Sequence, residues 1–137
     1  MTTVAQTTPA GSRPDVRAAV GTVRGTWEAG LGVFRGIPFA EPPVDSLRLR
    51  APRPVRRWDG VRDALAFGPP PPQAAAFGMD RSAQDATGHD WLTLNVWSPD
   101  PSREAGLPVM IWIHGGAYSI GMSSLPEYDG SRLARDG

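Results

Sequence analysis

The 137-residue sequence has no cysteine, no lysine and no excess of charge, because its 14 basic residues are balanced by 14 acidic ones. Without cysteine the chain forms no disulfide, and this agrees with a reducing compartment. Without net charge it offers no broad field to hold a nucleic acid backbone or an anionic membrane. No apolar run is long enough to span a bilayer. We therefore expect neither nucleic acid nor membrane as a partner.

The N-terminal end also lacks the apolar segment that a secretory signal peptide requires. Residues 1–17 are predicted to be a flexible leader, rich in Thr, Ala and Pro over their first 14 positions, and the chain is expected to be cytoplasmic. All basic residues are arginine, and alanine, glycine and proline are abundant, which indicates the codon bias of a GC-rich bacterial genome. A hydrophobic content of 40% is typical of a globular domain.

The first half of the sequence reads as a hairpin followed by a long loop. Ala18–Trp27 and Val33–Arg35 are rich in β-branched and small residues and flank turn chemistry at 30–32, which predicts a β-hairpin. Prolines then recur between Gly36 and Trp58, and each removes a backbone donor, so this stretch is predicted to be an ordered surface loop or a linker. The tract Pro69–Pro72 could dock on a proline-recognition domain, but a loop between folded elements is the better interpretation. Residues 74–88 show no period and are left unassigned.

Two strands are predicted further along. Trp91–Trp97 alternates, with Leu92, Leu94 and Val96 on one face, as in a half-buried strand. Pro108–Ile113 is apolar at every position, as in a central strand that helices cover on both faces.

The segment that follows carries the chemistry. His114-Gly115-Gly116-Ala117 places two glycines directly after the second predicted strand, where missing Cβ atoms allow unusual backbone angles and close approach to a ligand. Fixed backbone N–H groups about 3 Å from a developing oxyanion stabilise the tetrahedral intermediate of acyl transfer, and an HGG-type loop serves this purpose in esterases. The alternative is that the glycine pair only makes a tight turn.

The neighbourhood of this loop resembles the type-B carboxylesterase and cholinesterase family, of which the para-nitrobenzyl esterases are a branch. The resemblance runs in order over residues 18–137. The matching segments are Gly21–Gly25, Phe34–Pro43 (F-x-G-I-P-[YF]-A-x-P-P), Phe67–Pro69 with Pro72-Gln73, Asp90–Pro99, Pro108–Gly121 and Tyr128–Gly130.

The resemblance implies the N-terminal portion of an α/β-hydrolase fold with an incomplete sheet. It implies an oxyanion hole in which Gly116 and Ala117 donate N–H groups, while Gly115 allows the turn. The third donor and the Ser, acidic and His triad of the family follow beyond Gly137, so no catalytic triad residue is expected here. Implied partners are a small-molecule carboxylic ester and the remainder of the hydrolase chain, and no cofactor or metal is implied.

The chain departs from the family at three positions. Pro71 and Trp91 stand where cysteine is frequent, so the small disulfide-closed loop is absent. His89 replaces a carboxylate that commonly precedes Asp90, which changes the local salt bridge, and we interpret His89 as a solvated loop residue rather than a base.

Several other residues resemble catalytic groups. Ala117–Gly121 reads as A-x-S-x-G, a variant of the nucleophile elbow with Ser119 as its serine, yet no histidine follows it and His114 is too close along the backbone to be its base. Ser119 is therefore assigned to the oxyanion loop, and His114 to a positioning role with a local hydrogen bond. The remaining carboxylates are assigned to a turn and to helix ends: Glu127, Asp129 and Asp136, with Asp129 or Ser131 capping 132–135 and Gly137 as the stop.

Two functions follow. In the first, the intact gene product is a serine carboxylesterase of which this chain is a fragment or a split part. In the second, the chain belongs to a catalytically silent cholinesterase-like binding protein, or is an inactive truncated product. Because the predicted strand Val109–Ile113 needs neighbours on both edges and faces, we expect the chain alone to aggregate or to stay partly unfolded.

Overall fold

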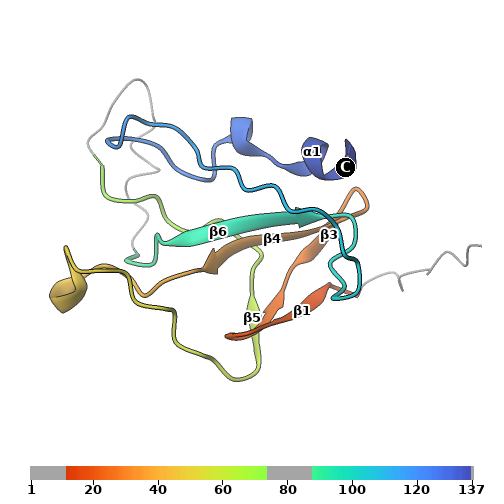
Figure 1. Cartoon of the computed structure of the whole chain (residues 1–137), viewed down its shortest axis with the longest axis horizontal. Coiled ribbons are helices and arrows are strands. Elements are labelled where there is room, and N and C mark those ends of the chain that lie inside the picture. Colours follow the sequence, from red (N-terminus) through yellow and green to blue (C-terminus); the bar gives the residue numbers. More distant parts are fainter. Residues whose placement is uncertain (1–11, 74–87, 137) are drawn as a thin grey trace, which may run out of the picture.

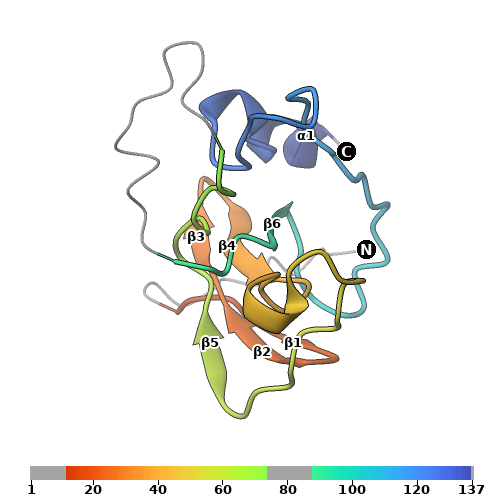
Figure 2. The same ribbon diagram turned by 90° about the vertical axis from the view of Figure 1, so that its left-hand side faces the viewer.

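The computed structural model describes residues 12–73 and 88–136, and within them two three-stranded sheets carry the fold (Figure 1). The first sheet has the order β1-β2-β5 and the second the order β3-β4-β6. The strands are β1 (Asp15–Ala18), β2 (Gly21–Arg24), β3 (Thr26–Glu28), β4 (Leu31–Pro38), β5 (Val61–Asp63) and β6 (Thr93–Ser98). Two 3₁₀ helices, η1 (Asp45–Leu47) and η3 (Pro126–Tyr128), and the helix α1 (Ser131–Asp136) complete the elements. Helix α1 packs near β4 and β6, above the sheets in Figure 2.

The predicted hairpin is present as β3 and β4, but its turn is shorter than expected. Ala29 and Gly30 form a two-residue connection with φ of 47° and 83°, and two positive angles are typical of the type I′ turn that suits the twist of paired strands. Gly32 therefore lies in β4 and faces Trp27. The turn is at 29–30 rather than 30–32.

The expected strand Ala18–Trp27 is divided at Gly25 into β2 and β3, which belong to different sheets. Gly25 donates its N–H to the Pro14 carbonyl at 2.9 Å, and a Cβ at position 25 would overlap the carbonyl oxygen of Val33. The strand changes sheets at the residue whose lack of a side chain lets the two backbones approach.

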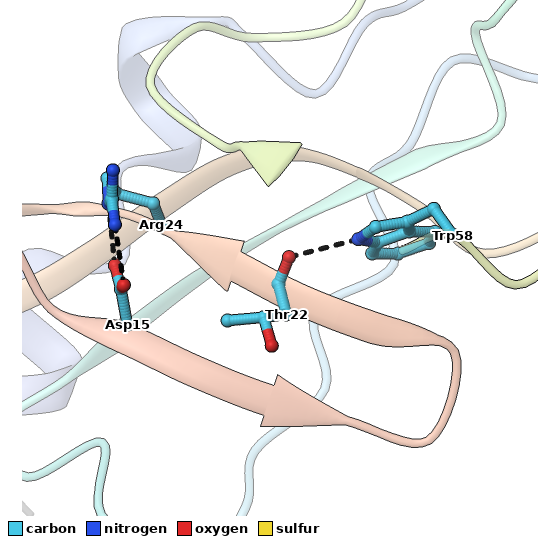
Figure 3. A network of polar contacts seen from close by, with 4 residues as sticks. All are labelled: Asp15, Thr22, Arg24 and Trp58. Carbon is cyan, nitrogen blue, oxygen red and sulfur yellow. Dashed lines mark hydrogen bonds and ion pairs between the residues drawn. The ribbon is translucent and has the colours of Figure 1, made fainter. Parts of the chain in front are cut away.

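The leader boundary at residue 17 is wrong, because Asp15–Ala18 forms β1, antiparallel to β2. Asp15 pairs with Arg24 across the ladder, and both Arg24 Nε and Nη2 donate to the carboxylate at 2.7 Å (Figure 3). A forked pair and a backbone ladder order these residues although their composition resembles a linker. Residues 1–11 of the expected leader lie outside the described residues.

Strand β4 is the centre of the second sheet and supplies most of the core. Leu31, Val33 and Phe34 are 2%, 1% and 2% exposed, and Phe34 packs with Val23 and Ala64. The core therefore lies between the two sheets, along β4.

The predicted loop 36–58 is wrong for its first three residues, since β4 continues to Pro38. A register shift between Phe34 and Ile37 releases the Gly36 N–H from the ladder, and the Asn95 side chain accepts it at 3.0 Å. Pro38 is tolerated because it ends the strand. Residues 39–58 form the expected loop, with η1 inside it.

Strand β5 was not foreseen. It runs parallel to β2, with Thr22 opposite Val61. The neighbouring Trp58 donates its indole N–H to the Thr22 carbonyl at 3.0 Å, which fixes the approach of this segment to the sheet (Figure 3).

The strand predicted over Trp91–Trp97 is present as β6, which begins two residues later at Thr93 and ends at Ser98, and its two faces are used differently from the expectation. The polar face with Asn95 and Trp97 is the more buried, whereas Leu94 and Val96 remain 40% and 37% exposed. The apolar face lies open.

The predicted central strand Pro108–Ile113 is wrong for this structure. The segment has no regular secondary structure, and Val109 and Ile113 are 86% and 88% exposed. Within the described part of the chain no strand pairs with it, so its apolar pattern has no sheet to join.

Candidate active site

The loop His114–Gly121 follows the exposed apolar segment and turns back toward η3 (Figure 1). Its turn is closed by the Gly116 carbonyl, which accepts the N–H groups of Ser119 at 2.9 Å and Ile120 at 3.0 Å. Gly116 has φ of 139°, and a Cβ there would overlap the Ile120 carbonyl oxygen. Glycine is thus required at this position by both angle and space.

The next two residues hold an unusual conformation. Ala117 and Tyr118 have φ of 50° and 61°, in the left-handed region that residues with a Cβ rarely enter. Such angles are maintained only where the surroundings determine them, and they gather at functional loops. At Gly115 an added Cβ would meet nothing within 4 Å, so this glycine borders open space.

The backbone donors of the loop divide into two groups. Ser119 and Ile120 use their N–H groups to close the turn. Among the described residues, the N–H groups of Gly116 and Ala117 have no hydrogen-bond acceptor. These are the two groups that the family resemblance implies as oxyanion donors.

His114 makes the local hydrogen bond that was expected. Its Nδ1 donates to the Gly115 carbonyl at 2.8 Å, and its ring stacks on Tyr128 with centroids 5.4 Å apart and an interplanar angle of 20°. The Trp112 ring lies against the same tyrosine, with the two ring centroids 6.3 Å apart. The start of the loop is thereby attached to η3.

The end of the loop is held by residues that sequence reasoning did not single out. The Gln73 side chain accepts the Gly121 N–H at 2.8 Å and donates to the Gly121 carbonyl at 2.9 Å. Two residues further on, Asn95 Nδ2 donates to the Ser123 carbonyl at 3.3 Å. Both lie inside the matching segments Pro72-Gln73 and Asp90–Pro99, but their partners are distant in sequence.

Ser119 is not arranged as a nucleophile. Its hydroxyl donates to the Ala117 carbonyl at 3.2 Å, within the loop itself. In the described part of the chain it has no hydrogen bond to a histidine or a carboxylate.

The acidic candidates take structural positions. Asp129 accepts the Ser131 N–H at 2.8 Å, and Ser131 is the first residue of α1, so the Asp129 carboxylate satisfies a free N–H of the first helical turn from just before the helix. Hydrogen bonds from the Ser131 hydroxyl and N–H hold the pKa of the Asp129 carboxyl below its usual range. Glu127 lies in η3 and Asp136 ends α1.

His89 is exposed, as expected, with its ring edge-on to Trp91 at 6.3 Å. The adjacent Asp90 forms its ion pair with Arg62 at 3.0 Å. Over the described ranges, no cluster of three or more His, Asp or Glu residues is arranged to hold a metal ion. None of the helices described is long and apolar enough to cross a membrane.

Comparison with known proteins places this geometry in a family. The sequence model of the carboxylesterase family matches residues 12–137. Phenmedipham hydrolase of Pseudarthrobacter oxydans is 44% identical over 130 residues, which cover 92% of this chain and 26% of that protein. Para-nitrobenzyl esterase of Bacillus subtilis is 44% identical over 124 residues, which cover 89% of this chain and 25% of that protein.

Solved structures agree. A carboxylesterase of Geobacillus stearothermophilus superposes with a TM-score of 0.78 at 40% identity, covering 90% of this chain and 24% of that one. A PNB esterase superposes with a TM-score of 0.74 at 41% identity, covering 90% and 24%. The fold class expected from the sequence, part of an α/β-hydrolase fold, is thereby confirmed. The chain spans about a quarter of the length of these relatives, and it belongs to the carboxylesterase family.

Proposed function

We propose that this chain supplies the oxyanion-hole loop of a carboxylic ester hydrolase that works through a serine acyl-enzyme. The observation that carries the proposal is the pair of backbone N–H groups at Gly116 and Ala117, which have no acceptor among the described residues and lie in a turn of constrained geometry. Membership of the carboxylesterase family supports the same reaction class.

In this reaction a serine hydroxyl gives its proton to the histidine base as its oxygen adds to the ester carbonyl carbon, and the carbonyl oxygen becomes an oxyanion. The N–H groups of Gly116 and Ala117 would donate to that oxygen, together with a third donor next to the nucleophile. Fixed donors stabilise the charge without reorganising as it forms, and loss of one such donor typically lowers kcat by about 10² to 10³. The serine, its histidine base and the acidic partner come from the part of the domain that this chain does not span.

The exposed apolar segment supports the need for that further part. Val109, Ile111 and Ile113 are at least 80% exposed, and an apolar run with unpaired backbone groups is a template for adding strands. We propose that the rest of a carboxylesterase domain, called here the complementing polypeptide, packs against this segment and completes the active site.

The test is hydrolysis of p-nitrophenyl acetate by the purified chain, alone and after mixing with a complementing polypeptide made from the unmatched part of Bacillus subtilis para-nitrobenzyl esterase. We expect the mixture to hydrolyse the ester and the chain without the complementing polypeptide to be inactive. The mixture should remain active when the chain carries Ser119→Ala. Turnover by the chain alone that Ser119→Ala abolishes would make Ser119 the nucleophile. A complex that assembles and hydrolyses no ester would favour a non-catalytic binding protein.

A further inference from the structure

Gln73 holds both main-chain polar groups of one distant residue. Its Oε1 accepts the Gly121 N–H at 2.8 Å, while its Nε2 donates to the Gly121 carbonyl at 2.9 Å and to the Pro71 carbonyl at 3.2 Å. A side-chain amide here does what a neighbouring strand does in an antiparallel pair. It connects two segments 48 residues apart in sequence.

Gly121, at the end of the loop, packs against the residues at the beginning of the loop. It is buried, has φ of 121°, and a Cβ there would lie 3.0 Å from the Gly115 carbonyl oxygen and 3.0 Å from two atoms of the His114 ring. Gly121 therefore lies directly against His114 and Gly115, so the two ends of the loop are in contact.

The loop between them needs this support. Gly116, Ala117 and Tyr118 have consecutive positive φ values, two of them at residues with a Cβ. Left-handed angles at such residues are unfavourable and relax unless the structure around them prevents it. The two hydrogen bonds to the Gly116 carbonyl act only within the loop, so they cannot fix it relative to the sheets. Gln73 supplies an attachment outside the loop at its C-terminal end, as the stacking of His114 on Tyr128 does at its start, and Asn95 of β6 holds Ser123 two residues beyond.

We infer that Gln73 is a positioning residue for the oxyanion-hole loop, an inference that rests on the proposed function. Without its amide, both polar groups of Gly121 lose their partner and the loop can relax away from positive φ. Relaxation would reorient the N–H groups of Gly116 and Ala117. Because the oxyanion is absent from the bound ester and develops only as the tetrahedral intermediate forms, the loss falls on kcat rather than on KM.

The first measurement is backbone amide exchange on the full chain, kept dilute to hold it monomeric. Gln73→Met, nearly equal in size, removes both hydrogen-bonding groups and is expected to lower the protection of the three hydrogen-bonded amides of the loop, Ser119, Ile120 and Gly121, by about 10-fold or more. Trp58→Phe is the matched control. It also removes a part-buried hydrogen bond from a side chain to a backbone carbonyl, but that carbonyl belongs to Thr22 in the sheet β1-β2-β5, away from the loop. The control should leave protection of the loop unchanged.

A second variant separates positioning from simple packing. In Gln73→Glu the carboxylate still accepts the Gly121 N–H but repels its carbonyl, whereas the protonated acid can accept and donate as the amide does. Protection factors, corrected for intrinsic exchange, should therefore be higher at acid pH than at neutral pH in this variant. Wild type and Gln73→Met should show no such recovery.

The kinetic measurement uses the complex with the complementing polypeptide. Gln73→Met is expected to lower kcat by about 10 to 100-fold with KM kept within about 2-fold, and Trp58→Phe to match wild type. The inference would be overturned if Gln73→Met left amide exchange of the loop unchanged, or if the wild-type loop showed no protection. It would also be overturned if Gln73→Met changed the exchange but left kcat unchanged. If the wild-type complex hydrolyses no ester, the proposed function fails, and the exchange data alone decide whether Gln73 holds the loop.

Discussion

Replacing Gly116 with alanine tests the geometry of the proposed oxyanion hole most directly. Its φ of 139° is a conformation that side chains rarely adopt, and the new Cβ would overlap the Ile120 carbonyl oxygen. The backbone conformation costs about 1 to 3 kcal/mol. The overlap involves main chain rather than a mobile side chain, so the turn itself must open, and with it the bonds from Ser119 and Ile120.

The effect on catalysis follows from how far the donors move. A misplacement of about 1 Å costs on the order of 10²-fold in rate, and complete loss of one oxyanion donor about 10² to 10³-fold. We therefore expect kcat/KM of Gly116→Ala in the complex to fall by about 10²-fold or more, equivalent to about 2.7 kcal/mol of transition-state stabilisation. Hydrolysis of p-nitrophenyl acetate measures this fall.

Gly106→Ala is the control for backbone strain without overlap. Gly106 has φ of 59°, and a Cβ there would meet only the Glu104 carbonyl oxygen at 3.9 Å. The control should lose stability by about 1 kcal/mol and keep its activity. Our reasoning about the loop would be refuted if Gly116→Ala kept kcat/KM within about 3-fold of wild type while folding as wild type does.

Three further predictions concern stability and association. Asp129→Ala should destabilise α1 by about 1 kcal/mol, measured as faster exchange of the backbone amides of α1. Because the pKa of Asp129 is lowered in the folded chain, the stabilisation by its carboxylate is fully present above the ordinary pKa of 3.8 and is lost as the pH falls through the folded pKa. Equal helix exchange in both proteins at pH 7 would contradict it. Ile111→Lys, at a side chain 80% exposed, should reduce self-association of the chain in light scattering, and unchanged scattering would exclude this segment as the cause. Trp58→Phe should lower the free energy of unfolding by about 1 kcal/mol in urea titrations through the lost bond to Thr22, and no change would show that water replaces it.

Elements with local patterns could be predicted from the sequence. The hairpin around Gly30 and strand β6 follow from turn residues and alternation, which act within a few positions. Strands β1 and β5 could not, because they exist through pairing with β2 and their own residues are mostly exposed. The division at Gly25 likewise depends on Val33 approaching from another strand.

Burial was the least predictable property. The apolar run Val109–Ile113 predicts a covered strand, yet composition cannot say whether covering elements are present, and within the described residues this run is exposed. In strand β6 the opposite occurred, since Asn95 and Trp97 lie on the more buried face. Asn95 is placed there because its amide oxygen accepts the Gly36 N–H that the ladder leaves free.

The sequence indicated which residues form the candidate loop, but not which residues hold that loop in place. Two adjacent glycines after an apolar run indicate a loop with free donors, and the positive angles at Ala117 and Tyr118 go beyond what glycine alone suggested. The attachment by Gln73 could not be deduced, because a glutamine with a partner 48 residues away leaves no local pattern.

The position of β4 between a near neighbour and a distant one has a consequence for biosynthesis. Strand β3 precedes it by one turn, whereas Gly32 pairs with Ser98 of β6 on the other edge. At about 5 to 20 residues per second, a ribosome needs roughly 3 to 12 seconds to add the intervening ~60 residues. A hairpin forms in microseconds, so the nascent chain presents one open, apolar edge for about a millionfold longer than it takes to create it. Cellular yield is therefore expected to depend on chaperones that shield this edge during translation as much as on the stability of the finished sheet.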